Sequence, residues 1–473
     1  MSSRGIAAAG VYVPRGRVTA EDVREAWGAF QGRGIDAKAV PAGDEDAVTM
    51  AVAAAGRALE NSAMSPNAVD AVAFATTTPP VAEEQLAPRV VQALGLSSET
   101  RTWHHGQSTA AGADALETAL NAEGTVLAVV ADAPVGDPAG SDHAFGAGAA
   151  AFLVDDDAAV TFAGVGSATD ESPGVRFREA AEEEVASLDI TGYERAAIRE
   201  TTRDAIADLG LDADRIDAAS LHQPNGSMPY RIAGEGVVSN GAVAEGTVVD
   251  RIGDAGAATA AIGLVAALET GGDESVLAAF YGSGGGAVAF AFEGRLDGDE
   301  AATLDDGERV SYVESLRKRG IVVDGDVAGG GANVSLPTWR RTLDSRYALT
   351  AGRCPACGAL SFPGEGACDD CHERVEFERA PLSSVGTVAA RTVIGHGGAP
   401  PEFVELQQRD GAYGAALVRL DARDGDGSVL MPAQLTDCDH ESVAVGDAVR
   451  RTVRRIYEQE GVVRYGAKFT PTE

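Results

Sequence analysis

The chain has 473 residues, 45% of them hydrophobic, and a formal net charge of −34 at pH 7. Its length allows two or three domains with cores of their own. The longest apolar runs are too short to span a bilayer and the N-terminus lacks the apolar stretch of a secretory signal, which predicts a cytoplasmic protein.

The charged residues predict a protein adapted to high salt. The acidic residues are scattered rather than gathered in one tail, and arginine supplies nearly all the positive charge, because Lys38, Lys318 and Lys468 are the only lysines. Such a surface is tolerated where salt screens the repulsion, which favours a haloarchaeal-type cytosol over capture of a basic partner. The acidic balance also argues against nucleic-acid binding.

Residues 1–295 alternate strand and helix patterns in two successive halves, 1–165 and 166–295. The predicted elements of the first half are strands at 5–14, 69–75 and 125–131 and a helix with an acidic first turn from Asp44. Those of the second half are a helix at 193–209, a strand ending at Leu221, a small-residue helix after Gly256, and strands at 275–281 and 287–292. Two α/β halves with alanine- and glycine-rich helices, which allow close approach, predict an α/β body of five layers, α/β/α/β/α.

The composition shifts to Asp, Glu and Gly after residue 295. Residues 296–335 are predicted to form a helix at 310–319 and a glycine-rich flexible linker at 325–333. Residues 336–378 begin with a short helix and contain a cysteine cluster. Strand patterns in residues 379–473 are spaced as in a small barrel.

Four cysteines form the most specific motif of the chain. They are arranged as C-x2-C, ten residues, and a second C-x2-C, and they are Cys354, Cys357, Cys368 and Cys371. Each pair lies on a tight turn that points two thiolates at one ion, and four thiolates make a closed tetrahedral shell, which predicts structural zinc. Disulfides or an iron site with the same ligands are the alternatives. Cys438 stands apart and is predicted to be a packed thiol.

The stretch from Trp103 to Leu116 is predicted as the end of a strand, a tight turn and the start of a helix. A helix start directs unpaired N–H groups and the positive end of the helix dipole at the side chains of its first turn. Thiol condensing enzymes place a nucleophilic cysteine at such a position, because the field favours the thiolate. Here the position holds the hydroxyls of Ser108 and Thr109, and no cysteine precedes Cys354.

His222 leaves a predicted strand and enters a turn in the segment His222-Gln223-Pro224-Asn225-Gly226. A histidine held at the end of a strand beside a cleft can donate to a thioester carbonyl or shuttle protons. A purely structural histidine is the alternative.

The segment from His222 to Gly226 resembles the histidine motif of archaeal-type hydroxymethylglutaryl-CoA (HMG-CoA) synthases. Further stretches resemble the same family in the same order, at 5–15, 40–55, 146–152, 252–263 and 281–286. This resemblance covers residues 1 to about 320 and implies a thiolase-type fold. From about residue 336 the chain resembles the zinc-ribbon and OB-fold accessory proteins of acyl-CoA condensing enzymes. In archaeal assemblies such a protein bridges a thiolase and the synthase, and here it is fused to the synthase-like part.

The positions that match the family's catalytic groups carry other residues. The resemblance places the family's cysteine on Thr109, its general-base glutamate on Thr77 and its oxygen-binding asparagine on Asp254, whereas His222 and the loop Gly282–Gly286 are retained. A threonine hydroxyl attacks a thioester only with an adjacent base. An ionised Asp254 would repel an oxyanion, and losing one oxyanion donor alone typically costs ~10²–10³ in rate. These departures argue against HMG-CoA synthesis by the family's route.

Two interpretations of this site remain open. In the first, the chain is a catalytically degenerate, acyl-CoA-binding subunit or scaffold of a thiolase/synthase complex. In the second, Thr109 or Ser108 forms a hydroxyl–His–carboxylate arrangement with His222 and Asp254 and performs acyl transfer or thioester hydrolysis. The substrate contacts that the resemblance implies are Asn225, Gly226, Gly282, Ser283 and Gly284. It also implies a coenzyme A thioester as ligand, a thiolase as partner and at least a homodimer.

Weaker alternatives concern single positions. Glu83 or Glu84 could replace the missing base, although both fit as acids in the first turn of a helix. Gln107 could stand in the nucleophile position, as in decarboxylating ketosynthase relatives, although the spacing to Gly112 fits Thr109 better. A nucleic-acid-binding ribbon and OB fold would need a basic groove with exposed aromatic residues, and the arginines at 450–455 lie among acids.

Overall fold

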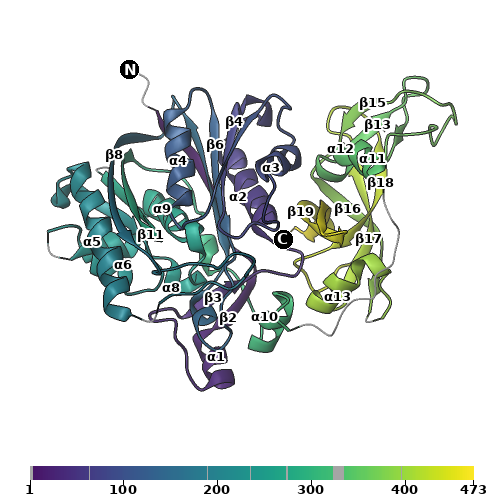
Figure 1. Cartoon of the computed structure of the whole chain (residues 1–473). Coiled ribbons are helices and arrows are strands. Elements are labelled where there is room, and N and C mark those ends of the chain that lie inside the picture. Colours follow the sequence, from purple (N-terminus) through teal and green to yellow (C-terminus); the bar gives the residue numbers. More distant parts are fainter. Residues whose placement is uncertain are drawn as a thin grey trace. The chain divides into compact units, whose positions relative to one another are not determined.

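A computed structural model of the chain describes residues 4–62, 64–188, 190–234, 236–272, 275–322, 335–395 and 397–472. The chain forms two compact units, each with its own hydrophobic core. The first unit runs to Leu316, apart from the short segments Gly43–Glu45 and Gln92–Gly95, which belong with the second unit, Arg317–Glu473. Figure 1 labels many of the elements of the two units.

The first unit is built on a nine-stranded mixed sheet with the order β5-β4-β6-β7-β1-β8-β11-β10-β9. In chain order its strands are β1 (Gly5–Tyr12), β4 (Ala71–Ala75), β5 (Arg101–His105), β6 (Val126–Asp132), β7 (Gly148–Asp155), β8 (Val160–Ser172), β9 (Ile216–Leu221), β10 (Ser275–Gly282) and β11 (Gly284–Gly294). Strands β1 and β8 pair over two residues only, so the sheet divides there into two halves. Each half has parallel strands at its outer end and antiparallel strands toward the division, so the plan repeats as the sequence predicts.

Helices cover both outer faces of this sheet and fill the space between its halves. Helix α2 (Ala47–Ser62) packs on β1, β6 and β7, and α5 (Thr191–Leu209) packs on β8, β10 and β11. Helices α4 (Ala111–Asn121) and α9 (Thr259–Thr270) contact strands of both halves. The resulting order of layers is α/β/α/β/α, which confirms the predicted thiolase-type body (Figure 1).

The central helices need small residues because backbone approaches them closely. A Cβ atom on Gly263 of α9 would lie 2.3 Å from the carbonyl oxygen of Gly246, and one on Gly112 of α4 would lie 2.8 Å from that of Ala257. Both distances are too short for a side chain. The alanine- and glycine-rich composition of these helices is therefore a packing requirement.

The rest of the first unit surrounds the layered body. A three-stranded sheet has the order β12-β2-β3, with β2 (Gly16–Thr19), β3 (Ala37–Val40) and β12 (Glu308–Arg309). The remaining helices are α1 (Ala20–Trp27), α3 (Ala87–Leu94), α6 (Met228–Ala233), α7 (Asn240–Glu245) and α8 (Val249–Ile252), and α10 (Tyr312–Lys318) leads into the second unit. The 3-10 turns in this part are η1 (Pro66–Ala68), η2 (Ser141–Ala144), η3 (Ala213–Arg215), η4 (Gly256–Ala258) and η5 (Ala302–Asp305).

The second unit combines a small three-stranded ribbon with a closed barrel. The ribbon has the order β14-β13-β15, with β13 (Thr350–Arg353), β14 (Leu360–Ser361) and β15 (Glu378–Pro381), and follows α11 (Leu336–Arg341) and α12 (Leu343–Tyr347). The barrel strands are β16 (Val385–Ile394), β17 (Tyr413–Asp421), β18 (Ser428–Leu435), β19 (Ala448–Gln459) and β20 (Val462–Pro471), with η6 (Pro401–Phe403) and α13 (Val404–Asp410) between the first two. The barrel closes in the order β16-β17-β18-β20-β19, the five-stranded arrangement expected of an OB fold.

Several predicted boundaries can be placed on the observed elements. The boundary at 165/166 falls inside β8, and the helix predicted at 310–319 is α10. The glycine-rich linker predicted at 325–333 lies outside the described residues. Within the described part of the chain, no helix has both the length and the apolar character needed to cross a bilayer.

Candidate functional site

A cavity of about 530 Å³ lies in the first unit, where β9 and β10 end near the turn before α4. Three of the residues that sequence analysis singled out, Thr109, His222 and Asp254, line this cavity. Its wall also includes charged residues that the sequence did not point to, among them Arg33, Arg176 and Glu194.

Thr109 lies in the turn between β5 and α4, directly before the first helical turn. Its side chain is 4% exposed, and its hydroxyl donates a hydrogen bond of 2.7 Å to the carbonyl oxygen of Tyr281 on β10. Ser108 and Gln107 are not among the residues that line the cavity. The Ser108 hydroxyl instead accepts from the backbone N–H of Ala110, and Gln107 is exposed, with a φ of 71°. Of the two hydroxyl residues in this turn, Thr109 is thus the one that lines the cavity.

His222 follows the last residue of β9 and is 8% exposed. Its ring lies at a tilt to the ring of Tyr281, with 5.6 Å between the ring centroids. The pKa of His222 is lowered to about 4, chiefly by burial; the negative charge of Asp254 opposes this shift and the positive charge of Arg176 adds to it. The imidazole is therefore neutral at pH 7, which makes it a weak base and leaves it one N–H to donate.

Asp254 is fixed by contacts on every side. Its backbone N–H donates to the carbonyl oxygen of Ala144 at 2.7 Å, and its carbonyl accepts from Gly146 at 3.0 Å. One carboxylate oxygen, Oδ1, accepts from the backbone N–H of Gly256 at 2.9 Å and from the hydroxyl of Thr259 at 3.3 Å. The carboxylate thus holds the turn that precedes α9.

Arg176 engages the second oxygen of that carboxylate. Its Nη1 donates to Oδ2 of Asp254 at 2.6 Å, and its guanidinium lies over the ring of Phe145, 4.9 Å from the centroid. Both contacts come from the loop after β8, which the sequence did not mark as functional. Asp254 therefore faces His222 as half of an ion pair rather than as a free carboxylate.

Two of the five predicted substrate contacts, Asn225 and Ser283, line the cavity. Asn225 is positioned by local structure, because its side-chain oxygen accepts from the backbone N–H groups of Ser227 and Met228 at 3.1 and 3.2 Å where α6 begins. This arrangement fixes the asparagine at the edge of the cavity.

The three predicted glycines do not line the cavity. Gly226 packs against the backbone of Gly34, where a Cβ would lie 2.1 Å from the Gly34 carbonyl oxygen. Gly282, the last residue of β10, lies where a Cβ would meet the Ser108 hydroxyl at 2.9 Å. Gly284 opens β11 with a φ of 106°, which favours glycine. These glycines shape the loops around the cavity.

The loop that contains Thr77 is organised by a buried acid, Asp132. This carboxylate accepts hydrogen bonds from the hydroxyls of Thr76, Thr77 and Thr78, at 2.9, 2.7 and 3.1 Å, and from backbone N–H groups of Thr77 and Ala257 at 2.6 and 2.8 Å. The threonines therefore hold an anion and lack a proton-accepting role. Asp132 ends β6 and carries no motif, so sequence analysis missed it.

The alternative base positions lie away from this network. The carboxylate of Glu84 pairs with Arg89 at 2.7 Å, and both Glu83 and Glu84 are exposed. Neither lines the cavity. The prediction that they are acids in the first turn of a helix is wrong, because α3 begins only at Ala87 and has no acid in its first turn, so both are acids of the exposed loop before it.

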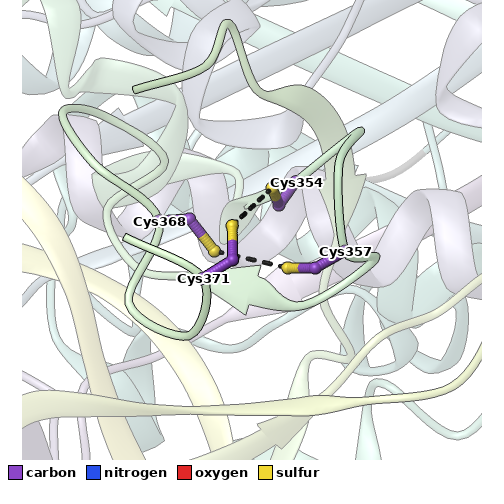
Figure 2. A group of neighbouring side chains, drawn as sticks. All are labelled: Cys354, Cys357, Cys368 and Cys371. Carbon is purple, nitrogen blue, oxygen red and sulfur yellow. Dashed lines mark hydrogen bonds between the residues drawn. The ribbon is translucent and has the colours of Figure 1, made fainter. Parts of the chain in front are cut away.

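The four cysteines of the second unit converge on one point. Figure 2 shows their sulfur atoms turned toward one another, and all four lie within 4.8 Å of one another. The sulfurs of Cys354 and Cys371 are 3.8 Å apart and those of Cys357 and Cys368 are 3.6 Å apart. Tetrahedral thiolates about 2.3 Å from a zinc ion have this spacing. The residues fit a closed, structural zinc site, as the motif predicts.

The layered body, with a buried histidine and a hydroxyl before the first turn of α4 at one cavity, defines a thiolase-type condensing-enzyme fold. Solved HMG-CoA synthases have this fold. One in complex with 3-hydroxy-3-methylglutaryl coenzyme A gives a TM-score of 0.58 at 20% identity, over 70% of this chain and 94% of that chain. Another, complexed with CoA, gives 0.60 at 16% identity over 70% and 95%.

The chain belongs to the HMG-CoA synthase family. It is 32% identical over 305 residues to the hydroxymethylglutaryl-CoA synthase of Methanopyrus kandleri, covering 61% of this chain and 87% of that protein. It is 30% identical over 306 residues to the synthase of Pyrococcus furiosus, covering 61% and 86%. In the second unit, residues 343–378 match the rubredoxin-like zinc ribbon domain of ChsH2. The predicted family resemblance of the body is confirmed, and so is the predicted zinc ribbon of the second unit.

Proposed function

We propose that this chain binds acyl-CoA as a subunit of an acyl-CoA condensing complex and forms no acyl-enzyme itself. The observation that carries the proposal is the hydrogen bond from the Thr109 hydroxyl to the carbonyl oxygen of Tyr281, at 2.7 Å. A hydroxyl becomes a nucleophile when a base accepts its proton. Here that proton is held by a backbone carbonyl, which cannot take it.

The neighbouring groups support the same proposal. His222 is buried and its pKa is lowered to about 4, far from the pKa near 7 that suits a general base at neutral pH. The Asp254 carboxylate, which would orient the histidine in a hydroxyl–His–carboxylate site, is bonded to Arg176, Gly256 and Thr259. Among the described residues, His222 has no hydrogen bond to Thr109 or Asp254. The active-acyltransferase interpretation is therefore the less favoured one.

Intact-protein mass spectrometry after incubation with acetyl-CoA and an acid quench tests this proposal. We expect the wild-type mass to remain unchanged. Thr109→Cys is the matched positive control, because it restores a thiol just before the N-terminus of α4, where the helix dipole favours the thiolate, and it should gain one acetyl group that peptide mapping places on residue 109. An acetyl group on wild-type Thr109 that disappears in His222→Ala would establish the enzyme instead.

The proposal includes a thiolase as the catalytic partner and a homo-oligomeric state. The family membership of the body and its fusion to a zinc ribbon and barrel support a role in an assembly. Affinity purification of the tagged chain from its native cells at high salt, followed by mass spectrometry, should recover a thiolase. Sedimentation of the purified chain as a monomer, with no thiolase recovered, would contradict this part of the proposal.

A nucleic-acid role is not supported by the arginines of β19. Arg454 is 1% exposed and pairs with Asp437 at 2.6 Å and Glu45 at 3.2 Å. Arg451 donates to the backbone carbonyls of Tyr347 and Ala93. These two side chains serve internal contacts of the second unit and are therefore not available to a phosphate backbone.

A further inference from the structure

Two arginines of the second unit lie over one aromatic ring. The guanidinium carbon of Arg346, on α12, is 4.5 Å from the ring centroid of Trp339 on α11, and that of Arg464, on β20, is 5.2 Å from the same centroid. Both distances are those of a cation–π contact. An aromatic ring attracts a cation but does not neutralise it, so two positive charges are gathered at this place.

Arg464 is buried without a carboxylate partner. The residue is 7% exposed, its Nε atom is buried with no acceptor, and no described residue forms an ion pair or a hydrogen bond with its guanidinium. Across the β19–β20 pair it lies opposite Tyr457, whose hydroxyl is likewise buried and without a hydrogen-bond partner in the described part of the chain. A buried donor without an acceptor costs free energy, and a buried charge without a counter-charge costs more.

Arg346 is half-buried, so solvent reaches this second arginine. Its Nε donates to the hydroxyl of Thr342 at 2.8 Å, and among the residues that the structure describes no acid forms an ion pair with it. Burial lowers the pKa of Arg346 below its ordinary value, while Tyr457 and Glu365 oppose the shift. The carboxylate of Glu365 itself pairs with Arg341, at 3.6 Å.

The missing counter-charge does not reflect a shortage of acids. The chain has 72 acidic residues against 38 arginines and lysines. Other arginines of the second unit have acidic partners, since Arg454 pairs with Asp437 at 2.6 Å and Arg409 pairs with Glu405 at 2.9 Å. The two arginines over the tryptophan ring thus present donors without acceptors, which is the surrounding that an oxyanion requires.

We infer that the second unit binds a phosphate dianion, free or as the monoester of a larger molecule, at Arg346 and Arg464. Two guanidiniums match the double charge of this group, whereas a carboxylate or a halide ion carries one charge. A guanidinium also presents its donors in a planar fork that fits phosphate oxygens. Tyr457 adds an uncharged hydroxyl donor, and the ring of Trp339 holds both guanidiniums in place. The inference goes beyond the proposed function, because these residues belong to the second unit and not to the cavity of the first.

Isothermal titration of the full chain with inorganic phosphate, at pH 7.5 in about 2 M KCl, tests the inference. Salt at this concentration screens exposed charges within a few ångströms, so binding that persists reports a buried or partly buried site. We expect one phosphate per chain with a Kd below about 1 mM. Arg464→Met and Arg346→Met should each weaken binding about tenfold or more, the effect of losing one charge-assisted hydrogen bond.

Arg419→Met is the matched control, because Arg419 is exposed on β17, a strand that pairs with neither β19 nor β20, and this variant should bind phosphate as the wild type does. Methyl phosphate in place of inorganic phosphate separates the two sources of the group. Affinity within about tenfold of that for inorganic phosphate assigns the site to a monoester of a larger molecule, and a greater loss assigns it to the free ion.

Thermal unfolding gives a second measurement that does not depend on the titration. Arg464→Met removes a buried charge that has no counter-charge and keeps most of the apolar volume, so without phosphate it should unfold at the same temperature as the wild type or higher. Addition of about 50 mM phosphate should raise the unfolding temperature of the wild type and of Arg419→Met more than that of Arg464→Met.

Any of three results overturns the inference. These are no phosphate binding to the wild type, wild-type affinity in either arginine variant, and an Arg464→Met chain that unfolds below the wild type without phosphate. The last result would mean that the guanidinium has an anionic partner within the chain.

Discussion

At the scale of single residues, the buried His222 makes the free energy of unfolding depend on pH. Its pKa is about 4 in the folded protein, against an ordinary value of 6.5, because burial disfavours the charged ring. As pH falls below 6.5 the unfolded chain takes up a proton at this residue and the folded chain does not. The contribution of His222 to the free energy of unfolding is therefore highest above pH 6.5, declines toward pH 4 and levels off below it.

Replacing this histidine should remove that part of the pH dependence. Between pH 7.5 and pH 5 the wild-type protein should lose about 2 kcal/mol more of its free energy of unfolding than His222→Gln loses. Urea unfolding of both proteins at the two pH values, in the same salt, measures the difference. His104→Gln replaces a more exposed ring whose pKa is also lowered by burial, so its difference from wild type between the two pH values should be smaller. If the free energy of unfolding changes with pH equally in wild type and His222→Gln, the ring is protonated as readily in the folded state as in the unfolded state, which would contradict the prediction.

The residues of the cavity differ in how far the sequence could predict them. Thr109 and His222 are set by local structure, since each follows a strand at a turn that the sequence pattern marks. Arg176 is separated from Asp254 by 78 residues, and no motif surrounds it. Asp132 is likewise 55 residues from Thr77. Such partners depend on how the sheet is folded, which a local pattern does not contain.

At the scale of elements, the two cysteine turns of the zinc ribbon (the zinc knuckles, Cys354–Cys357 and Cys368–Cys371) are the part that the spacing of residues in the sequence predicts best. The residue after the second cysteine of each pair, Gly358 and His372, has a positive φ, of 80° and 60°. The N–H groups of these residues donate to the carbonyls of Cys354 and Cys368, at 2.8 and 3.0 Å, which closes each turn. The two knuckles thus share one local geometry, and a local geometry can be inferred from a local motif.

The zinc ribbon should depend on its metal. Residues 343–378 form a domain below the roughly 40 residues at which a core alone is usually insufficient, so metal binding supplies much of its folding free energy. We expect one zinc per chain by plasma mass spectrometry, a loss of zinc in Cys357→Ser, and full zinc content in Cys438→Ser. Limited proteolysis should cut the ribbon of Cys357→Ser first. Iron in place of zinc, or a Cys357→Ser chain that retains its metal, would contradict the assignment.

Helices and strands were predicted more reliably than their limits. The acidic segment from Asp44 does start a helix, but α2 begins only at Ala47, because Asp46 acts as its cap and accepts from the N–H groups of Val48 and Thr49. Strand β8 continues to Ser172, past the predicted end of the first half, because it pairs along the length of β11. Where a helix is capped and how far two strands pair depend on residues that are neighbours in the folded structure, which the local sequence does not identify.

At the scale of the whole molecule, the division into two units includes segments that the sequence did not assign. Gly43–Glu45 belongs with the second unit, where the Lys468 ammonium donates to the carboxylate of Asp44 at 2.9 Å across 424 residues of sequence. The hydroxyl of Thr436 donates to the same carboxylate at 3.1 Å. Burial raises the pKa of Asp44, but the positive charges of Lys468 and Arg454 and the hydrogen bonds from Lys468 and Thr436 outweigh burial, so the pKa is lowered. The composition of the sequence places a domain boundary near residue 300. Short segments from before that boundary that belong with the second unit are revealed only by contacts between residues far apart in the sequence.

The net charge of −34 makes the stability of the molecule depend on salt. Repulsion among exposed acids destabilises the compact state, and it is screened within about 10 Å at 0.1 M salt but within about 3 Å at 1 M. Screening also weakens surface ion pairs such as that of Arg199 with Glu200, but exposed pairs contribute only about 0–1 kcal/mol each. The stability gained by screening the repulsion should therefore outweigh the stability lost from these ion pairs.

We expect the unfolding temperature at pH 7.5 to rise by roughly 5 °C or more between 0.1 M and 2 M KCl. Calorimetry across this series measures the rise. At pH 5, closer to the isoelectric point of about 4.5, protonation of acids removes part of the repulsion and the rise should shrink. An unfolding temperature that falls with KCl at pH 7.5 would mean that the acidic surface is not an adaptation to salt.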